Sequence, residues 1–200
     1  MIRIDTTQGS PEWFAEKAGK PGASSFDKII TTTGQPSKQS QGYLYQLAAE
    51  AITGQVEQGY QSAAMTQGIE REAESRTLYE LINGVEVKQV GFVYADEQKM
   101  YGCSPDGIVG DEWGLELKNV LPKTQVAYLL NGGLPSDYFC QVQGSLLVTG
   151  FARWDFFTYS PGLDPFQLSV ERDEKFIAKL KEQLEKFCFE LAGIVRKLRG

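Results

Sequence analysis

Residues 104–118 read Ser-Pro-Asp-Gly-Ile-Val-Gly-Asp-Glu-Trp-Gly-Leu-Glu-Leu-Lys. Two turn sequences, Ser-Pro-Asp-Gly and Gly-Asp-Glu, bracket a short apolar pair, which is typical of a strand hairpin. In the strand that follows, side chains alternate between two faces. Leu115 and Leu117 are therefore expected to enter a core, while Glu116 and Lys118 share the opposite face.

Asp106 lies in the first turn and adds a second carboxylate to this hairpin. A hairpin of this length can bring that carboxylate beside Glu116, with the ammonium of Lys118 on the same face. Two carboxylates and one ammonium are then placed to hold a divalent ion and to orient a water molecule beside it. Each part alone has a plainer explanation, because Pro-Asp-Gly is usually only a turn and Glu-x-Lys is usually a solvated pair.

The rest of the chain predicts an α/β or α+β fold, with a central mixed β-sheet flanked by helices. Capping residues and apolar periodicity predict helices at residues 10–19, from residue 24, and at 41–53, 62–82, 122–131, 136–148 and 173–198. One or two strands are predicted over residues 85–87 and 91–94, and further strands at 99–103, 115–120, 152–159 and 166–170. No repeat or low-complexity tract divides the chain, so residues 1–200 are predicted to form one domain.

The composition excludes several chemistries. There is no histidine, which excludes Ser-His-Asp and Cys-His hydrolases and histidine-ligated zinc sites. Three scattered cysteines suit neither a disulfide framework nor a four-cysteine cluster. Any metal must then be held mainly by oxygen ligands, which favours magnesium, manganese or calcium. The net charge of −6 argues against a protein that simply coats nucleic acid, although a local basic path is compatible with it.

The apolar runs are short. They span only a few residues, whereas a membrane-crossing helix needs about 20. The N-terminus lacks the basic and then apolar run of a signal peptide. We therefore expect no membrane partner and a cytoplasmic location.

A further carboxylate stands on the helix predicted at residues 62–82. Glu72 shares a face with Met65, Ile69, Arg76 and Tyr79, and this face is mostly apolar. A carboxylate buried there without a partner would be costly, so Glu72 is predicted to have one. The plainer interpretation is a structural ion pair with Arg76, one turn later.

Four motifs in this order resemble the lambda-type phage exonuclease family, within the PD-(D/E)xK nuclease superfamily. They are Gly68-Ile69-Glu70-Arg71-Glu72, Ser104-Pro105-Asp106-Gly107, Leu115-Glu116-Leu117-Lys118 and Tyr138-Phe139-Cys140-Gln141-Val142-Gln143. The resemblance runs from about residue 13 to residue 159, and it implies a core like that of the restriction endonucleases.

The resemblance implies a magnesium-dependent 5′→3′ exonuclease on double-stranded DNA, which releases 5′-mononucleotides and leaves a 3′ single strand. By motif position, Asp106 and Glu116 would bind magnesium, for which manganese can substitute. Lys118 would position or deprotonate the attacking water, and Glu72 would complete the metal shell or orient that water. Gln141 would assist in positioning. Lys118 can release a proton only if its pKa falls, and metal charge and burial both act in that direction.

The resemblance also implies a pocket for the 5′-phosphate of the DNA end, formed by Lys17, Ser24 and Ser25. Lys17 replaces the family's usual arginine and lacks its bidentate fork, so a weaker or shared grip on phosphate is expected. Met65 matches an apolar residue that wedges between base pairs. The structural alternatives are that Lys17 and Ser24 cap helices and that Met65 only packs.

Further expectations come from the family alone. They are a homotrimeric ring around duplex DNA, a single-strand annealing protein as partner, and a phage or prophage protein in the cytoplasm of a bacterial host. Two other hypotheses stay open. An endonuclease or junction-cleaving enzyme of the same superfamily would use Asp106, Glu116 and Lys118 without an end pocket. A non-catalytic recombination adaptor would retain only the fold.

Overall fold

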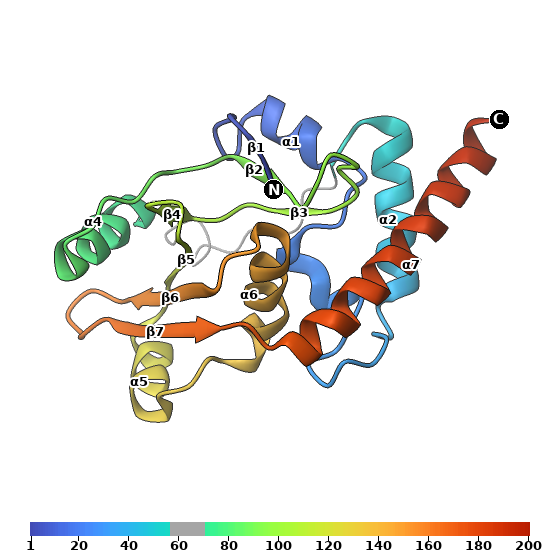
Figure 1. The fold of residues 1–200 in the computed structure, drawn as a ribbon. Coiled ribbons are helices and arrows are strands. Elements are labelled where there is room, and N and C mark those ends of the chain that lie inside the picture. Colours follow the sequence, from blue (N-terminus) through green and yellow to red (C-terminus); the bar gives the residue numbers. More distant parts are fainter. Residues whose placement is uncertain (57–70) are drawn as a thin grey trace.

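The computed structural model describes residues 1–56 and 71–200, which form two β-sheets surrounded by helices (Figure 1). The larger sheet has four strands in the order β4-β5-β6-β7. They are β4 (Gly107–Val109), β5 (Trp113–Asn119), β6 (Arg153–Tyr159) and β7 (Phe166–Glu171). Strands β5 and β6 run parallel and the other neighbours run antiparallel, which confirms the predicted mixed sheet.

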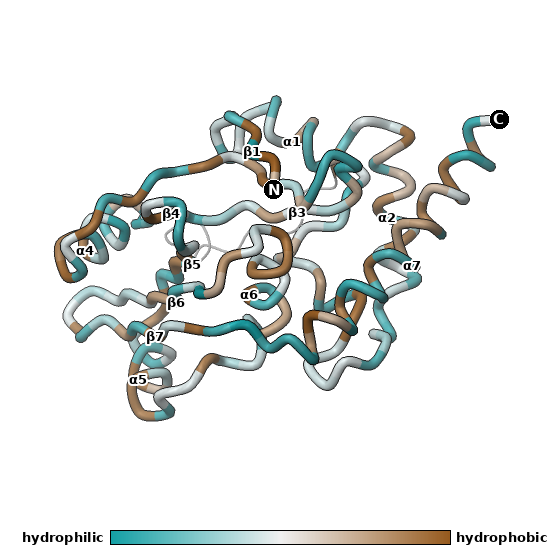
Figure 2. Tube along the Cα trace, viewed as in Figure 1, coloured by the Kyte–Doolittle hydropathy of each residue, from teal (hydrophilic) through white to brown (hydrophobic). Residues whose placement is uncertain are grey.

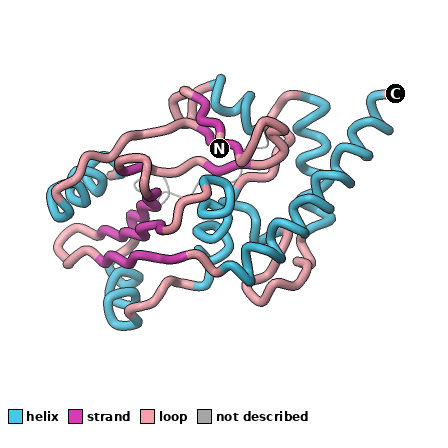
Figure 3. Tube along the Cα trace, in the orientation of Figure 1, coloured by secondary structure: helices cyan, strands magenta, loops and turns pink. Residues whose placement is uncertain are grey.

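The smaller sheet is antiparallel and lies apart from the larger one (Figure 3). It consists of β1 (Ile2–Ile4), β2 (Phe92–Tyr94) and β3 (Gly102–Cys103). The sequence predicts one central sheet, and the structure divides its strands between two. The strand predicted at 99–103 is shortened because Lys99 has a φ of 53°, which is incompatible with an extended strand. Residues 85–87 form no strand, although Lys88 next to them makes an isolated bridge to Ile108.

The helices follow the predicted order. They are α1 (Pro11–Lys17), the 3₁₀-helix η1 (Ala23–Lys28), α2 (Ser40–Thr53), α4 (Glu72–Asn83), α5 (Pro122–Asn131), α6 (Ser136–Thr149) and α7 (Glu174–Arg199). Ser10 caps α1 by accepting a hydrogen bond from the Trp13 N–H, and Asp173 caps α7 in the same way through the Phe176 N–H. Of the helix predicted at 62–82, residues 62–70 lie outside the described part of the chain.

Helix α6 holds the molecule together. It lies at the centre and contacts both sheets, η1 and α7 (Figure 1). Gly144 is the point of closest approach to η1, because a Cβ built there would lie only 2.4 Å from the ring of Phe26. Any larger residue would push η1 away from α6. The packing thus holds η1, which carries Ser24 and Ser25, against α6, which carries Gln141.

Helices α2 and α7 pack against each other at one side of the molecule (Figure 1). Hydrophobic and hydrophilic residues alternate along α7 with the turn of the helix, as Figure 2 shows. Its apolar face is buried, including Leu180 and Leu184, which are fully covered. Within residues 1–56 and 71–200, no helix combines the length and the apolar character that crossing a membrane requires.

Candidate active site

The hairpin of β4 and β5 fixes Asp106 against β5. Gly107 pairs with Leu115, and the backbone N–H of Asp106 donates to the Leu115 carbonyl over 3.1 Å. The carboxylate of Asp106 then accepts a hydrogen bond from the Leu117 N–H, with Oδ2 and N 2.7 Å apart. Asp106 is therefore held through both its backbone and its side chain beside the strand that carries Glu116.

Glu116 lies in the middle of β5 and is only 1% exposed. Its Oε1 forms an ion pair with the ammonium of Lys118 and accepts a hydrogen bond from Gln141 Nε2 over 2.6 Å. Leu115 and Leu117 are buried on the other face of β5, as the alternation predicted. The structure thus excludes the solvated Glu-x-Lys pair and brings Asp106, Glu116, Lys118 and Gln141 to one place.

Burial and mutual repulsion set the charges in this cluster. Burial raises the pKa of Asp106, although Lys118 and the Leu117 N–H oppose it. The pKa of Glu116 rises to about 7, mainly through burial, with the lowering influence of Lys118 partly offset by the repulsion of Asp106. Without a cation, the site therefore favours a proton on one carboxylate at mildly acidic pH.

Lys118 behaves differently from expectation. Burial acts to lower its pKa, as predicted, but the carboxylates of Glu116 and Asp106 outweigh burial and raise the pKa above its usual value. In the metal-free protein Lys118 is therefore a firmly protonated ammonium. Proton release from it requires a competing positive charge on the two carboxylates.

Glu72 begins helix α4 and faces this cluster from the side. Burial and the charge of Asp106 raise its pKa, whereas Arg76 and Lys118 lower it. Glu72 also forms the ion pair with Arg76 that the plainer interpretation predicted. Glu72 therefore has a structural partner in Arg76, and its carboxylate is also close enough to Asp106 for the two charges to interact.

The anchor that holds α4 in place was not predicted from the sequence. The hydroxyl of Tyr79, on α4, donates to Asp155 Oδ2 over 2.6 Å, and the indole Nε1 of Trp113 donates to the same hydroxyl over 3.1 Å. Tyr79 and Asp155 are both almost completely buried. Tyrosine on an apolar helix face gave no signal of this contact, because its partner lies 76 residues away on β6.

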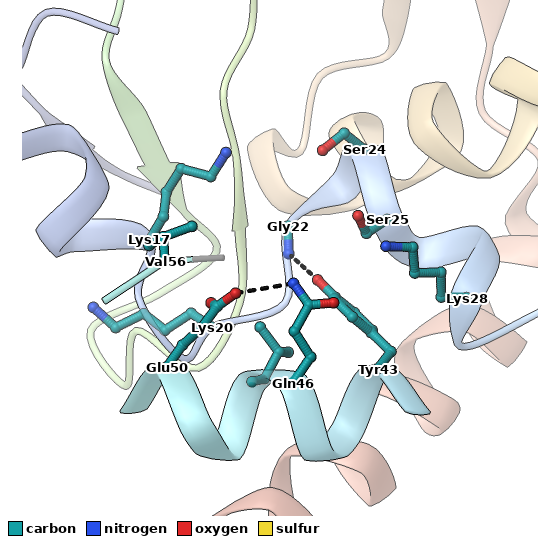
Figure 4. A pocket seen from close by; sticks show the side chains of 11 residues that line it. Lys17, Lys20, Gly22, Ser24, Ser25, Lys28, Tyr43, Gln46, Glu50 and Val56 are labelled. Carbon is teal, nitrogen blue, oxygen red and sulfur yellow. Dashed lines mark hydrogen bonds between the residues drawn. The ribbon is translucent and has the colours of Figure 1, made fainter. Parts of the chain in front are cut away.

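The residues predicted to bind a 5′-phosphate lie next to the cluster. A small cavity of about 30 Å³ is lined by Lys17 and Ser24 on one side and by Ser104 and Gln141 on the other. Gln141 thus links this cavity directly to Glu116. Ser25 does not line the small cavity but faces a larger one of about 400 Å³, which shares Lys17 and Ser24 with it (Figure 4).

Lys17 is positioned by an aromatic ring. Its Nζ lies 3.8 Å from the centre of the Trp13 ring, and the Trp13 Nε1 donates to the Ser104 hydroxyl over 3.1 Å. Burial lowers the pKa of Lys17 to about 8, with the charge of Glu50 acting in the opposite direction. Ser104 was not singled out from the sequence, although it stands two residues before Asp106 and shares its turn. Met65, the predicted wedge, lies outside the described residues.

The donor chemistry of the cluster suits a hard divalent cation. In residues 1–56 and 71–200, no three Asp, Glu, His or Cys side chains gather as a metal-binding group. Asp106 and Glu116 together offer two carboxylates, and magnesium is commonly held by one or two carboxylates, with water and substrate phosphate completing its shell. The residues present therefore fit magnesium or manganese better than a metal that needs a full protein cage.

Comparisons with known proteins show to which family the chain belongs. Residues 12–152 match the YqaJ-like viral recombinase domain. An alkaline exonuclease (LHK-Exo) from Laribacter hongkongensis has a TM-score of 0.85 at 30% sequence identity, covering 95% of this chain and 96% of its own. The structure of LHK-Exo in complex with dAMP gives the same values. A search of curated proteins gave no significant match.

A phage-related exonuclease from Haemophilus somnus 129PT is more distant. It has a TM-score of 0.65 at 14% identity, covers 90% of this chain and 96% of its own, and shows a shared fold only. The family match spans well over half of the sequence, and the alkaline exonuclease covers nearly all of it. The chain therefore belongs to the YqaJ-like viral recombinase domain family and is a nuclease.

Proposed function

We propose that this protein is a magnesium-dependent 5′→3′ exonuclease that degrades one strand of double-stranded DNA from its end. One observation carries the proposal: Asp106, Glu116 and Lys118 converge beside Gln141, which also lines the small cavity of Lys17 and Ser24. A site for hydrolysis thus adjoins a basic, hydroxyl-lined cavity suited to a terminal phosphate. The complex of the related alkaline exonuclease with dAMP, a nucleoside monophosphate, supports a 5′-mononucleotide as the product.

Each residue has a proposed role in phosphodiester hydrolysis. Asp106 and Glu116 hold magnesium, which when bound polarises the phosphate and favours ionisation of water. Lys118 orients the attacking water. Once its two carboxylate partners are engaged by magnesium, the Lys118 ammonium would release a proton to solvent, and the resulting amine could accept the proton of the attacking water. Gln141 keeps the Glu116 carboxylate in one orientation, and Glu72 helps to orient the water from the side of α4. Manganese is expected to replace magnesium because its ligand preference is similar.

The pocket for the 5′-phosphate determines the direction in which the strand is digested. Lys17 and Ser24 bind the 5′-phosphate, with Ser104 as a third contact from the turn of Asp106. The water then attacks the next phosphorus, the 3′ oxygen of the first nucleotide leaves, and a new 5′-phosphate is formed for the following cycle. A 3′ single strand remains, which we propose is passed to a single-strand annealing protein. A homotrimeric ring around the duplex and action in the cytoplasm of a phage host complete the proposal.

Digestion of a linear duplex tests this function. One strand carries a 5′-phosphate and different fluorophores near its two ends, and reactions contain magnesium, manganese or EDTA. We expect mononucleotides from the 5′ end first with either metal, and none with EDTA. Asp106→Asn keeps the size and an acceptor oxygen for the Leu117 N–H, and it should lower the rate by about 100-fold or more, as loss of a residue central to catalysis typically does.

Other results would select another function. Cutting of a covalently closed circle favours the endonuclease, and earlier release from the 3′ end contradicts the proposed polarity. DNA binding without metal-dependent cleavage favours the adaptor. Light scattering tests the ring separately, because a monomer at working concentration would contradict it without affecting the chemistry.

A further inference from the structure

The larger basic cavity extends away from the hydrolytic cluster, beyond Lys17 and Ser24 (Figure 4). Its volume is about 400 Å³, which is in the size range of cavities that hold whole small-molecule ligands rather than one small group. It shares Lys17, Gly22 and Ser24 with the small cavity, and these residues form the wall between the two. A terminal phosphate held at this wall would face open space on its far side.

The charges around this space suit an anion. Lys17 and Lys28 lie on two sides, and the hydroxyls of Ser24 and Ser25 lie between them (Figure 4). The Lys28 Nζ lies 5.0 Å from the centre of the Tyr43 ring, just as Lys17 lies over Trp13. A ring contact engages one side of an ammonium that has three N–H donors, so donors remain for a ligand. In a protein of net charge −6, this gathering of lysines is local.

Not every group on the cavity wall attracts an anion. The carboxylate of Glu50 lies on the floor, where it accepts hydrogen bonds from Gln46 Nε2 over 2.9 Å and from the Gly19 N–H over 3.3 Å. Lys20 also lines the cavity, but its ammonium donates to the Tyr94 hydroxyl and the Glu16 carbonyl. The anion-attracting part is therefore the rim of Lys17, Ser24, Ser25 and Lys28, and Glu50 limits how deeply a negative ligand can enter.

We propose that Ser25 and Lys28, the rim residues that line only the larger cavity, bind additional phosphates attached to the 5′-phosphate, so that the enzyme accepts DNA ends bearing a 5′-triphosphate. This inference rests on the proposed function, because the first phosphate must occupy the wall of Lys17 and Ser24. Hydrolysis breaks the same bond as at a monophosphate end: water adds to the phosphorus that joins the first and second nucleotides, the 3′ oxygen of the first nucleotide leaves, and that oxygen gains a proton. The first product is then a nucleoside 5′-triphosphate with its chain of phosphates intact.

The test uses three forms of one duplex sequence, which differ only in whether one strand carries a 5′-hydroxyl, a 5′-monophosphate or a 5′-triphosphate. The other strand is blocked against digestion. We expect the triphosphate end to be digested at least as fast as the monophosphate end and faster than the hydroxyl end. Chromatography of the first product should show a nucleoside triphosphate. Lys28→Ala should slow the triphosphate end by about tenfold, as loss of one charged hydrogen bond predicts, and change the monophosphate end by less than about twofold. Lys175→Ala, on the exposed face of α7, is the matched control and should change neither rate.

Three results would overturn the inference. They are a triphosphate end as slow as the hydroxyl end, an equal effect of Lys28→Ala on both phosphorylated ends, and release of a monophosphate as the first product. Failure of the proposed function is distinguishable, because then the monophosphate end would itself not be digested from the 5′ side. Circular dichroism of Lys28→Ala checks that the fold survives.

Discussion

Gln141 Nε2 donates a hydrogen bond to Glu116 Oε1 over 2.6 Å, which ties helix α6 to strand β5 inside the cluster. Glu116 has Lys118 as its other partner. The glutamine thus fixes the orientation of a carboxylate without contributing charge. Gln141 also lines the small cavity beside Lys17, so one residue connects the hydrolytic cluster with the proposed phosphate pocket.

Gln141→Ala should lower kcat by about 10-fold to 100-fold, a smaller loss than for Asp106→Asn, because it frees Glu116 to reorient without removing a charge. Steady-state digestion at several magnesium concentrations is the measurement. Part of the loss should be recovered at high magnesium, since a poorly oriented carboxylate binds the ion more weakly. A matched control is Gln143→Ala, which instead removes contacts to Glu171 and Asp173 and should not alter the magnesium dependence. If Gln141→Ala left the magnesium dependence unchanged, Gln141 would have no part in positioning a metal ligand.

The metal-free protein should lose stability as pH rises from 4.5 to 7. The pKa of Glu116 is about 7 in the folded protein and near its ordinary value in the unfolded chain. Between these values the folded state retains a proton that the unfolded state has released, so the free energy of unfolding falls with rising pH. Asp106 shifts in the same direction. The total effect is up to about 3 kcal/mol for Glu116.

Urea unfolding in EDTA at pH 5, 6, 7 and 8 measures this effect. Glu116→Gln keeps an acceptor oxygen for Gln141 but cannot titrate, so its stability relative to the wild type should improve from pH 5 to pH 8. A constant difference between the two proteins across this range would show that Glu116 titrates normally. Excess magnesium should stabilise the wild type more than Glu116→Gln, because the ion binds the ionised carboxylate that the variant lacks.

Much of the fold and of the cluster followed from the sequence because the deciding contacts are local. The pairing of Asp106 with β5 needs only a hairpin, and the period of two along a strand places Glu116 and Lys118 together. Helix ends were also local, as with Ser10 and Asp173 at their caps. These features depend on neighbours within about a dozen residues.

Features that depend on distant contacts were not predicted. The division into two sheets depends on β1, which pairs with β2 some 90 residues later, so no nearby pattern reveals it. The raised pKa of Lys118 required the burial of Glu116 and Asp106 to be known together. The role of Ser104 depended on Trp13, which lies 91 residues away and donates to its hydroxyl.

Tyr79→Phe should destabilise the protein by about 1–3 kcal/mol, because it leaves Asp155 and the Trp113 indole without their shared partner. Denaturant unfolding measures the loss. The ring remains, so its packing against Phe157 is retained and the effect reports on the hydroxyl. Tyr159→Phe is the matched control, since that hydroxyl bonds to Glu74 at the surface and should contribute little. Equal stability of the two variants would contradict the anchoring role of Tyr79.

The preference for a 5′-phosphate should weaken as pH rises through 8 in the wild type. The pKa of Lys17 is about 8 in the free protein, chiefly because it is buried, and it is the cation shared by both cavities. The Trp13 ring lies against the Lys17 ammonium, and the charge of Glu50 favours the protonated form of Lys17. Two further cations, Lys20 and Lys28, line the same larger cavity. Below pH 8 Lys17 is an ammonium that can pair with phosphate, and above it the charge is lost.

The ratio of kcat/KM for 5′-phosphorylated over 5′-hydroxyl ends, measured from pH 6.5 to 9.5, isolates this effect because changes in the chemical step cancel. The wild-type ratio should fall about tenfold across the range, as loss of one charged hydrogen bond predicts. Lys17→Arg should keep the ratio high and flat, since a guanidinium stays charged throughout. Lys17→Ala should give a low and flat ratio. A wild-type ratio that does not change with pH, together with an unchanged ratio in Lys17→Ala, would place recognition of the 5′-phosphate elsewhere on the protein.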